Sequence, residues 1–212
     1  MNYFCSMNKL KQFETIIFDL GGVLLDIDYQ ATTNAFRDLG ITDFELHYNQ
    51  LQQESLFDAF EKGEISGQHF INKLMNIVPK GVTPNQIVSA WNAMLGNFPL
   101  KKIELLERVS ETHQTFLLSN TNEIHMPIVY RKWNNVSSLP FNALFKQVYL
   151  SFEIGKRKPD VETFQWVIQQ NKLNAEKTLF IDDSPQHIEG AKKAGLNTHF
   201  YQSEEEFYAL FS

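Results

Sequence analysis

Five short apolar runs, each followed by polar or turn-forming residues, restrict the fold of this 212-residue chain more than any other feature. Continuous apolar runs of this length are typical of strands buried on both faces, as in a parallel sheet covered by helices. Helical periodicity at 101–113, 160–170 and 185–194 lies between them, and this alternation predicts a doubly wound α/β fold. The runs span residues 15–19, 115–119, 147–151, 178–182 and 197–201.

One interval, residues 28–98, breaks this alternation, because it shows helical periodicity and no convincing strand. Ser66 is positioned to cap one helix, and residues 83–86 (TPNQ) form a capping box with proline in the first turn. We therefore predict a helical unit at 28–98, inserted after the first strand of a core formed by 12–27 and 99–212. Residues 1–11 are expected to form a flexible tail.

Polar residues follow three of the apolar runs. Asp19 ends the first run, Ser119 and Asn120 end the second, and Asp182 and Asp183 end the fourth. Open α/β sheets bind ligands beyond the carboxyl ends of their strands, which share one edge when the strands are parallel. We therefore expect these carboxylates and this hydroxyl to converge on one site.

Such a set of groups suits phosphoryl transfer. Mg²⁺ prefers oxygen ligands, typically one or two carboxylates together with phosphate oxygens. A cation must balance the phosphoryl charge, and the segment 155–160 (GKRKPD) offers Lys156, Arg157 and Lys158. Gly21 and Gly22 let the backbone turn sharply and approach a phosphate closely.

The composition restricts the partners and the compartment. A formal charge of −6 gives no general attraction to nucleic acid or to acidic membranes. The single cysteine, Cys5, excludes an intrachain disulfide and fits a reducing cytoplasm. No apolar run approaches the roughly 20 residues that span a bilayer, and the first dozen residues lack a signal-peptide core. We expect a cytoplasmic monomer or homodimer whose partner is a small phosphate ester.

Four segments, taken in order, resemble the four motifs of the haloacid dehalogenase (HAD) superfamily, and the helical interval resembles its C1-type cap. The segments are FDLGGVLLD, LLSNTN, GKRKPD and FIDDSPQHIEGAKKAG. The order and spacing match from residue 13 onward. The strings EKGEIS and YLSFEIGKRKPD are more specifically similar to a bacterial α-D-glucose-1-phosphate phosphatase-like subgroup. The resemblance implies a Rossmann-like core with a helical cap, and a Mg²⁺-dependent phosphatase of a sugar phosphate such as glucose 1-phosphate.

The resemblance also implies a role for each motif residue. Asp19 would be the nucleophile that forms an aspartyl-phosphate, with Ser119 and Lys158 as further catalytic residues. The metal ligands would be Asp19, the Gly21 carbonyl, and Asp183 supported by Asp182. The phosphate-binding residues would be Gly21, Gly22, Ser119, Asn120 and Lys158.

The position of Gly21 departs from the usual HAD pattern. Most HAD phosphatases have an aspartate there that protonates the leaving oxygen and later activates water. The glucose-1-phosphatase-like subgroup also has glycine, so the loss need not abolish activity. Two explanations are open: a leaving group that needs little protonation, such as an anomeric hydroxyl, or replacement of the aspartate by a water, Asp26 or His125.

Gly21 also keeps open a different class of function, a catalytically weak phospho-ligand-binding or regulatory protein. Haloacid dehalogenation is a less favoured alternative, because the Asp182-Asp183 pair would then have no ligand. In the interval 28–98, the aromatic residues Phe57, Phe60 and Trp91 are expected to pack helices together. The loop 62–64 is either an ordinary turn or a substrate contact.

Overall fold

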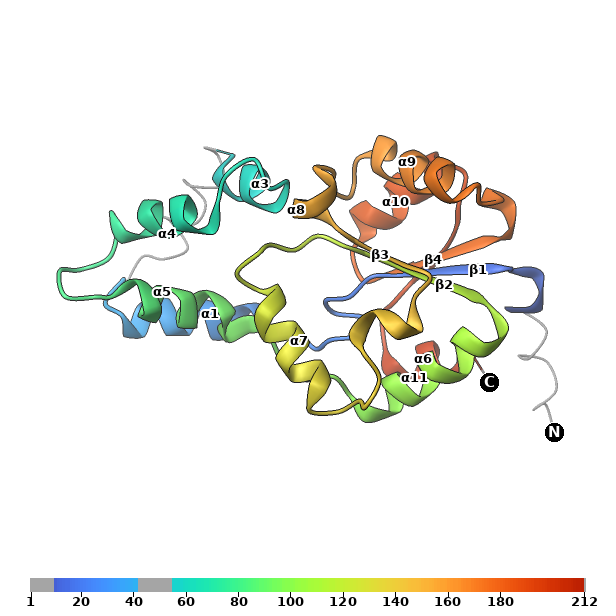
Figure 1. The fold of residues 1–212 in the computed structure, drawn as a ribbon, viewed down its shortest axis with the longest axis horizontal. Coiled ribbons are helices and arrows are strands. Elements are labelled where there is room, and N and C mark those ends of the chain that lie inside the picture. The colour runs from blue at the N-terminus through green and yellow to red at the C-terminus, as the bar shows by residue number, and fades with distance from the viewer. Residues whose placement is uncertain (1–9, 42–54, 212) are drawn as a thin grey trace.

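The computed structural model describes residues 10–41 and 55–211, and a parallel sheet lies at the centre of its larger part (Figure 1). Within these residues the sheet has five strands in the order β3-β2-β1-β4-β5. The strands are β1 (Thr15–Phe18), β2 (Gln114–Ser119), β3 (Gln147–Leu150), β4 (Thr178–Asp182) and β5 (Asn197–Phe200). The predicted α/β fold is confirmed, and each predicted run matches its strand to within one residue at either end.

The central strand β1 is buried on both faces, as its continuous apolar run predicts. Ile16 and Phe18 belong to one hydrophobic cluster and Ile17 to another, because successive side chains of a strand point to opposite sides of the sheet. The two clusters fill the spaces between the sheet and the helices on either face.

Helices cover both faces of the sheet (Figure 1). One face packs against α9 (Val161–Asn171) and α10 (Pro185–Lys193). The opposite face packs against α6 (Leu100–Thr112), α7 (Met126–Asn134) and α11 (Glu204–Leu210). The shorter elements are η1 (Leu10–Gln12), η3 (Phe141–Leu144), α8 (Ser151–Ile154) and η4 (Ala175–Lys177). Apart from Leu10 and Lys11, the predicted tail at 1–11 lies outside the described residues.

Four of the described helices lie together at one end, beyond the sheet (Figure 1). These are α1 (Tyr29–Asp38), α3 (Leu56–Glu61), α4 (Gly67–Met75) and α5 (Pro84–Trp91), and α5 continues into η2 (Asn92–Met94). They share a hydrophobic cluster of their own, which includes Phe36, Phe60, Phe70 and Trp91. On this packing we propose that residues 28–98 form a separate cap, and we call these four helices the cap helices.

The local sequence explains where several helices begin. Ser66 caps α4 by accepting from the His69 N–H, and Thr83 forms the predicted capping box with Gln86 at the start of α5. Asp160 and Ser184 occupy the N-cap positions of α9 and α10, but neither side chain makes a capping hydrogen bond. Among the described residues, no helix combines the length and the apolar character needed to cross a membrane.

Candidate active site

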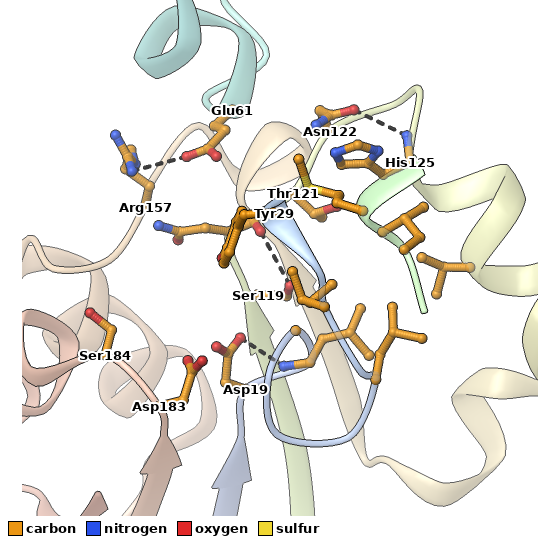
Figure 2. A pocket seen from close by; sticks show the side chains of 18 of the residues that line it. Asp19, Tyr29, Glu61, Ser119, Thr121, Asn122, His125, Arg157, Asp183 and Ser184 are labelled. Carbon is orange, nitrogen blue, oxygen red and sulfur yellow. Dashed lines mark hydrogen bonds and ion pairs between the residues drawn. The ribbon is translucent and has the colours of Figure 1, made fainter. Parts of the chain in front are cut away.

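The candidate site lies at the carboxyl ends of three adjacent strands. Asp19 directly follows β1, the middle strand, and β1 pairs with β2 on one side and β4 on the other. Ser119 ends β2, and Asp182 ends β4 with Asp183 next to it. The strand order therefore brings the three polar segments to one edge, as predicted. Figure 2 shows Asp19, Asp183 and Ser119 gathered at this edge.

Lys158 joins two of these segments from within the protein. Its Nζ donates to Asp19 Oδ1 at 2.7 Å and to Asp182 Oδ2 at 2.6 Å. Its side chain has no solvent exposure. Hydrogen bonds from a charged donor are strong, and burial removes the water that would otherwise weaken them. Lys158 is thus fixed against the carboxylate that is the predicted nucleophile.

The side chain of Asn120 explains how Lys158 is held in place. Asn120 Nδ2 donates to the Lys158 carbonyl at 2.8 Å, and the Lys158 N–H donates to Asn120 Oδ1 at 2.9 Å. The loop after β2 therefore fixes the backbone of the segment that carries the lysine. This amide is engaged in that contact. We therefore expect the backbone N–H of Asn120, rather than its side chain, to make the predicted contact with phosphate.

The two adjacent aspartates differ in their surroundings. Asp182 is fully buried, and both of its oxygens are occupied: they accept from Lys158, from the Ser184 N–H at 2.8 Å, and from His187 Nδ1 at 2.9 and 3.0 Å. Asp183 is exposed and lines the cavity described below. Of the pair, Asp183 is therefore the carboxylate that can bind an ion, and Asp182 fixes the position of Lys158.

Burial and charge change the pKa values of these groups in different directions. Burial raises the pKa of Asp19 to about 8; Lys158 opposes this shift, whereas Asp182 and Asp183 add to it. Burial also acts to raise the pKa of Asp182, but Lys158 and His187 outweigh it and hold that pKa well below its usual range. One lysine thus serves two buried carboxylates. A further positive charge beside Asp19 would favour its ionised form.

Oxygen ligands for such a cation are present. Asp19, Asp182 and His187 each place one potential ligand atom within 4.8 Å of the others, but Asp182 and His187 already bond to each other. Asp19 Oδ1 accepts from Lys158 and from the Leu20 N–H at 2.7 Å, which leaves Oδ2 without a donor among the described residues. Asp19 together with Asp183 is the better fit to a hard divalent cation, which prefers carboxylate oxygens.

Two glycines shape the turn after Asp19. Gly22 has a φ of +79°, and a Cβ there would lie 2.0 Å from Asp183 Oδ2, so no larger residue fits without displacing that carboxylate. At Gly21 a Cβ would lie 3.2 Å from Ile27 Cγ1, which is tight but not prohibitive. The absence of an aspartate at Gly21 therefore removes a possible acid/base group from a place that could nearly accommodate it.

These residues open into a cavity of about 500 Å³ between the core and the cap helices. Its core wall, as we name it, consists of Asp19, Gly21, Ser119, Asn120 and Asp183. Its cap wall includes Phe57 and Glu61 from α3 and Trp91 from α5, together with Tyr29 from α1 and Met94 from η2. Phe57 and Trp91 stack with ring centroids 5.6 Å apart, so they pack helices as expected and also face the cavity.

Arg157 connects the two walls. Its Nη1 pairs with Asp58 Oδ1 at 2.8 Å, and its Nη2 lies 3.0 Å from Glu61 Oε2 (Figure 2). Asp58 also pairs with Lys62 at 2.9 Å. Arg157 is therefore a link between the core and α3.

The structure brings every predicted site residue to this edge of the sheet. Asp19, Gly21, Ser119, Asn120 and Asp183 line the cavity; Lys158 and Asp182 lie behind them, and Gly22 packs against Asp183. Sequence reasoning offered Arg157 as a candidate cation but did not predict its pairing with Glu61, because a contact between segments 96 residues apart leaves no local pattern. It left His125 open; the structure places His125 in the cavity lining.

Comparison with known proteins adds a family and several relatives. The model of the haloacid dehalogenase-like hydrolase family matches residues 16–200. The chain is 29% identical to the D-ribitol-5-phosphate phosphatase of Bacteroides thetaiotaomicron, over 87% of this chain and 90% of that protein. It is 24% identical to the glyceraldehyde 3-phosphate phosphatase of Methanocaldococcus jannaschii, over 86% and 82% respectively.

A solved structure is also similar over nearly the whole chain. The HAD family enzyme BT-2542 of Bacteroides thetaiotaomicron, crystallised as the wild-type protein with magnesium and inorganic phosphate, superposes with a TM-score of 0.87. The two sequences are 30% identical, and the superposition covers 94% of this chain and all of the other. The fold and the whole arrangement of core and cap helices therefore have a counterpart that was solved with both a metal and a phosphate.

Proposed function

The chain belongs to the haloacid dehalogenase-like hydrolase family, and from this we propose that it is a Mg²⁺-dependent phosphatase of a phosphorylated small molecule. One observation carries the proposal. Lys158 is buried between Asp19 and Asp182, while Asp183 faces the cavity beside Asp19. This arrangement supplies a nucleophile, a fixed cation for a phosphoryl group, and a free carboxylate for a metal.

Asp19 would act as the nucleophile. A bond forms between a carboxylate oxygen of Asp19 and phosphorus as the bond from phosphorus to the leaving oxygen breaks, which gives an aspartyl-phosphate and an alkoxide that takes up a proton. Water then attacks the phosphorus, and the carboxylate and inorganic phosphate are released. Lys158 and the Ser119 hydroxyl would contact the phosphoryl oxygens, where they stabilise the charge of the transition state.

A divalent cation fits the residues present. Asp19 and Asp183 would hold it with the Gly21 carbonyl, while Asp182 maintains the position of Lys158. When bound, Mg²⁺ supplies positive charge that reduces the repulsion between the carboxylate and an anionic phosphoryl group. It would also counteract the burial that raises the pKa of Asp19 to about 8, because a nearby positive charge favours the ionised form.

We further propose that the substrate is a phosphorylated sugar or polyol. The proteins that support this are phosphatases named for D-ribitol 5-phosphate and glyceraldehyde 3-phosphate. The cavity of about 500 Å³ is the right size for a small metabolite. Glucose 1-phosphate stays a candidate, since its anomeric leaving group needs less protonation than an ordinary alcohol and Gly21 supplies no acid.

A catalytically weak phospho-ligand-binding protein is the second candidate, and Gly21 is the observation that favours it. Such a protein would use Lys158, Ser119 and the metal to bind a phosphate ester without completing its hydrolysis. Dehalogenation remains less favoured, because it would give Asp183 no ligand.

The test is hydrolysis of p-nitrophenyl phosphate, D-ribitol 5-phosphate and glucose 1-phosphate by the wild type, with Mg²⁺ and with EDTA. We expect turnover that depends on Mg²⁺ and falls by about 10⁴-fold or more in Asp19→Asn, because no other carboxylate can replace the nucleophile. The uncharged amide resembles the protonated form that burial favours, so the variant should fold. Binding of a phosphate ester by the wild type without turnover would favour the second candidate.

A matched pair of variants tests the metal site separately. Asp183→Asn should raise the Mg²⁺ concentration needed for half-maximal turnover, because it removes a charged ligand that faces the cavity. Glu189→Gln makes the same change on α10, on an exposed residue that pairs with Lys192, and should leave that concentration unchanged. Equal Mg²⁺ dependence in the two variants would contradict the metal assignment.

A further inference from the structure

His125 is a cavity residue that the chemistry above does not use. It follows the loop after β2, directly precedes α7, and is only 6% exposed. Its ring lines the cavity, and its backbone N–H donates to Asn122 Oδ1 at 3.0 Å. Figure 2 shows His125 with Asn122 and Thr121, well apart from Asp19 and Asp183. It therefore lies where the part of a substrate beyond the phosphoryl group would extend.

The hydrogen bonds of Asn92, in η2, fix the tautomer of this histidine. Asn92 Nδ2 donates to the Val88 carbonyl at 2.9 Å, which orients the amide and leaves Oδ1 as an acceptor. His125 Nδ1 lies 2.8 Å from that Oδ1 and must carry the proton. Burial lowers the pKa of His125 to about 4, so the ring is neutral at physiological pH. Nε2 then presents a lone pair and no proton.

The position of the ring is fixed as well. Trp91 stacks on it with centroids 5.4 Å apart and an angle of 6° between the planes. Trp91 and Asn92 both belong to the cap, so the cap determines the plane and the tautomer of a histidine on the core. Among the described residues, no hydrogen bond is made to Nε2. This nitrogen also keeps some exposure to solvent. It is an oriented acceptor that is still available.

We infer that His125 determines specificity: its Nε2 accepts a hydrogen bond from a hydroxyl on the non-phosphoryl part of the substrate, which makes the substrate class phosphorylated polyols or sugars. The inference rests on the proposed function, which it deepens. A phosphoryl oxygen has no proton to donate and would be repelled by this lone pair, whereas a hydroxyl fits it. Since Nε2 has no proton, His125 does not replace the acid that is missing at Gly21.

An acceptor that the bound substrate covers discriminates strongly. A substrate without the hydroxyl leaves Nε2 desolvated and unpaired, and sites built to bind a hydroxyl reject analogues that lack it. The experiment therefore compares D-ribitol 5-phosphate with n-pentyl phosphate under Mg²⁺. Both are primary phosphate esters with five carbons, and the second has no hydroxyl groups. The measured quantity is the ratio of their kcat/KM values.

Two amide variants separate the two ring nitrogens. In His125→Gln the amide reaches the position of Nε2 and can accept there, whereas in His125→Asn it reaches only the position of Nδ1 and keeps the bond to Asn92. Both lose the stacked ring. We expect the wild type to prefer D-ribitol 5-phosphate by tenfold or more, His125→Asn to lose at least tenfold of this ratio, and His125→Gln to keep most of it. His69→Asn, on an exposed face of α4, is the control and should match the wild type.

Three results would overturn the inference: a wild type with no preference, an unchanged ratio in His125→Asn, or an equal loss in both variants. If neither variant folds, Asn92→Leu provides the same test, because it removes the acceptor that keeps the proton on Nδ1 of His125. An unchanged ratio in that variant would again overturn the inference. The outcomes also separate this inference from the proposed function. Suppose that p-nitrophenyl phosphate is hydrolysed in a reaction that needs Asp19, but the ratio of kcat/KM values is the same in wild type and His125→Asn. That result rejects only the role of His125. No turnover of any ester rejects the proposed function.

Discussion

The two walls of the cavity are built in different ways. The core wall lies in front of a buried network in which Lys158 binds Asp19 and Asp182, and strands β1, β2 and β4 supply its residues. The cap wall is mainly aromatic, with Phe57 and Trp91 stacked beside a single carboxylate, Glu61. The core wall concentrates charge, and the cap wall provides shape and apolar surface.

This difference assigns the walls different tasks. Fixed charges in a site with little water stabilise a transition state strongly, so the core wall suits the chemical step. Aromatic surface with few oriented polar groups suits the selection of a ligand. The described contacts between the parts include the pairing of Arg157 with α3, the bond from His125 to Asn92 and the stacking of Trp91 on His125. The predictions below test the walls and these links.

The largest effect is expected where the core wall depends on one residue. Lys158→Met leaves Asp19 and Asp182 buried without their shared cation, and breaking a buried pair in this way costs about 3–5 kcal/mol of folding free energy. Urea unfolding should show that loss, and turnover should fall by about 10³-fold, since the fixed charge facing the phosphoryl group is lost. Lys156→Met is the matched control on the neighbouring lysine, and a similar loss of stability there would contradict the assignment.

The core wall could be predicted from the sequence because its cause is local. An apolar run that ends in Asp19 or Asp182 places that carboxylate at the end of a strand, and parallel pairing brings the strand ends together. The sequence also predicted Lys158 through the motif that contains it. It did not predict that Asn120 holds the backbone of Lys158, because that bond depends on the three-dimensional path of two loops.

The cap wall was less predictable, because its features depend on contacts between segments that are far apart in the sequence. Phe57 and Trp91 follow helical periodicity, which predicts that they pack against neighbouring helices but not that they also face a cavity. Arg157 looks like a surface charge in sequence, and only the approach of α3 gives it Asp58 as a partner. Ion pairs and tautomers at an interface between two parts depend on how those parts pack, and neighbouring residues carry no signal of it.

The second prediction concerns the buried histidine that joins the walls. In the unfolded chain His125 takes up a proton near pH 6.5, whereas burial lowers its pKa to about 4 in the folded protein. Between these values the unfolded state binds more protons, so stability is present above about pH 6.5 and is lost as the pH falls towards 4. The loss from this residue reaches about 3 kcal/mol at pH 4.

Unfolding by urea at several pH values, with wild type and His125→Gln, measures this contribution. The difference between their stabilities should change by about 1.1 kcal/mol per pH unit between pH 6 and pH 4.5, with the wild type losing more as the pH falls. Parallel pH profiles would show that the imidazole is not held neutral, and would remove the argument that Nε2 is an acceptor.

The third prediction concerns the acid/base side chain that is missing from the core wall at Gly21. Gly21→Asp restores an acid/base group, and we expect turnover of n-pentyl phosphate to rise by about tenfold because its poor leaving group needs a proton. Turnover of p-nitrophenyl phosphate should change little. The new Cβ crowds Ile27, so stability should fall by about 1 kcal/mol. Gly21→Asn causes the same crowding without an acid, and an equal gain in that variant would reject the acid/base explanation.

The smallest effect is expected at the ion pairs between the walls, which are partly exposed to solvent. Arg157 is 28% exposed at its side chain, and its partners Asp58 and Glu61 are 38% and 29% exposed. Water and salt weaken such pairs, so Arg157→Gln should cost only about 0.5–1 kcal/mol. If these pairs hold the cap wall over bound substrate, KM should rise by a few-fold while kcat stays nearly constant, and the difference from wild type should shrink at high salt.

Lys62→Gln is the matched control, because it also removes a cation paired with Asp58 but one that lies within the cap. It should leave KM unchanged, since no contact between the walls is lost. A fall in kcat in Arg157→Gln would show instead that Arg157 acts through its neighbour Lys158 on the core wall. An equal rise in KM in the two variants would mean that Asp58 serves to stabilise α3 itself. In either case the walls would be less independent than their different chemistry indicates.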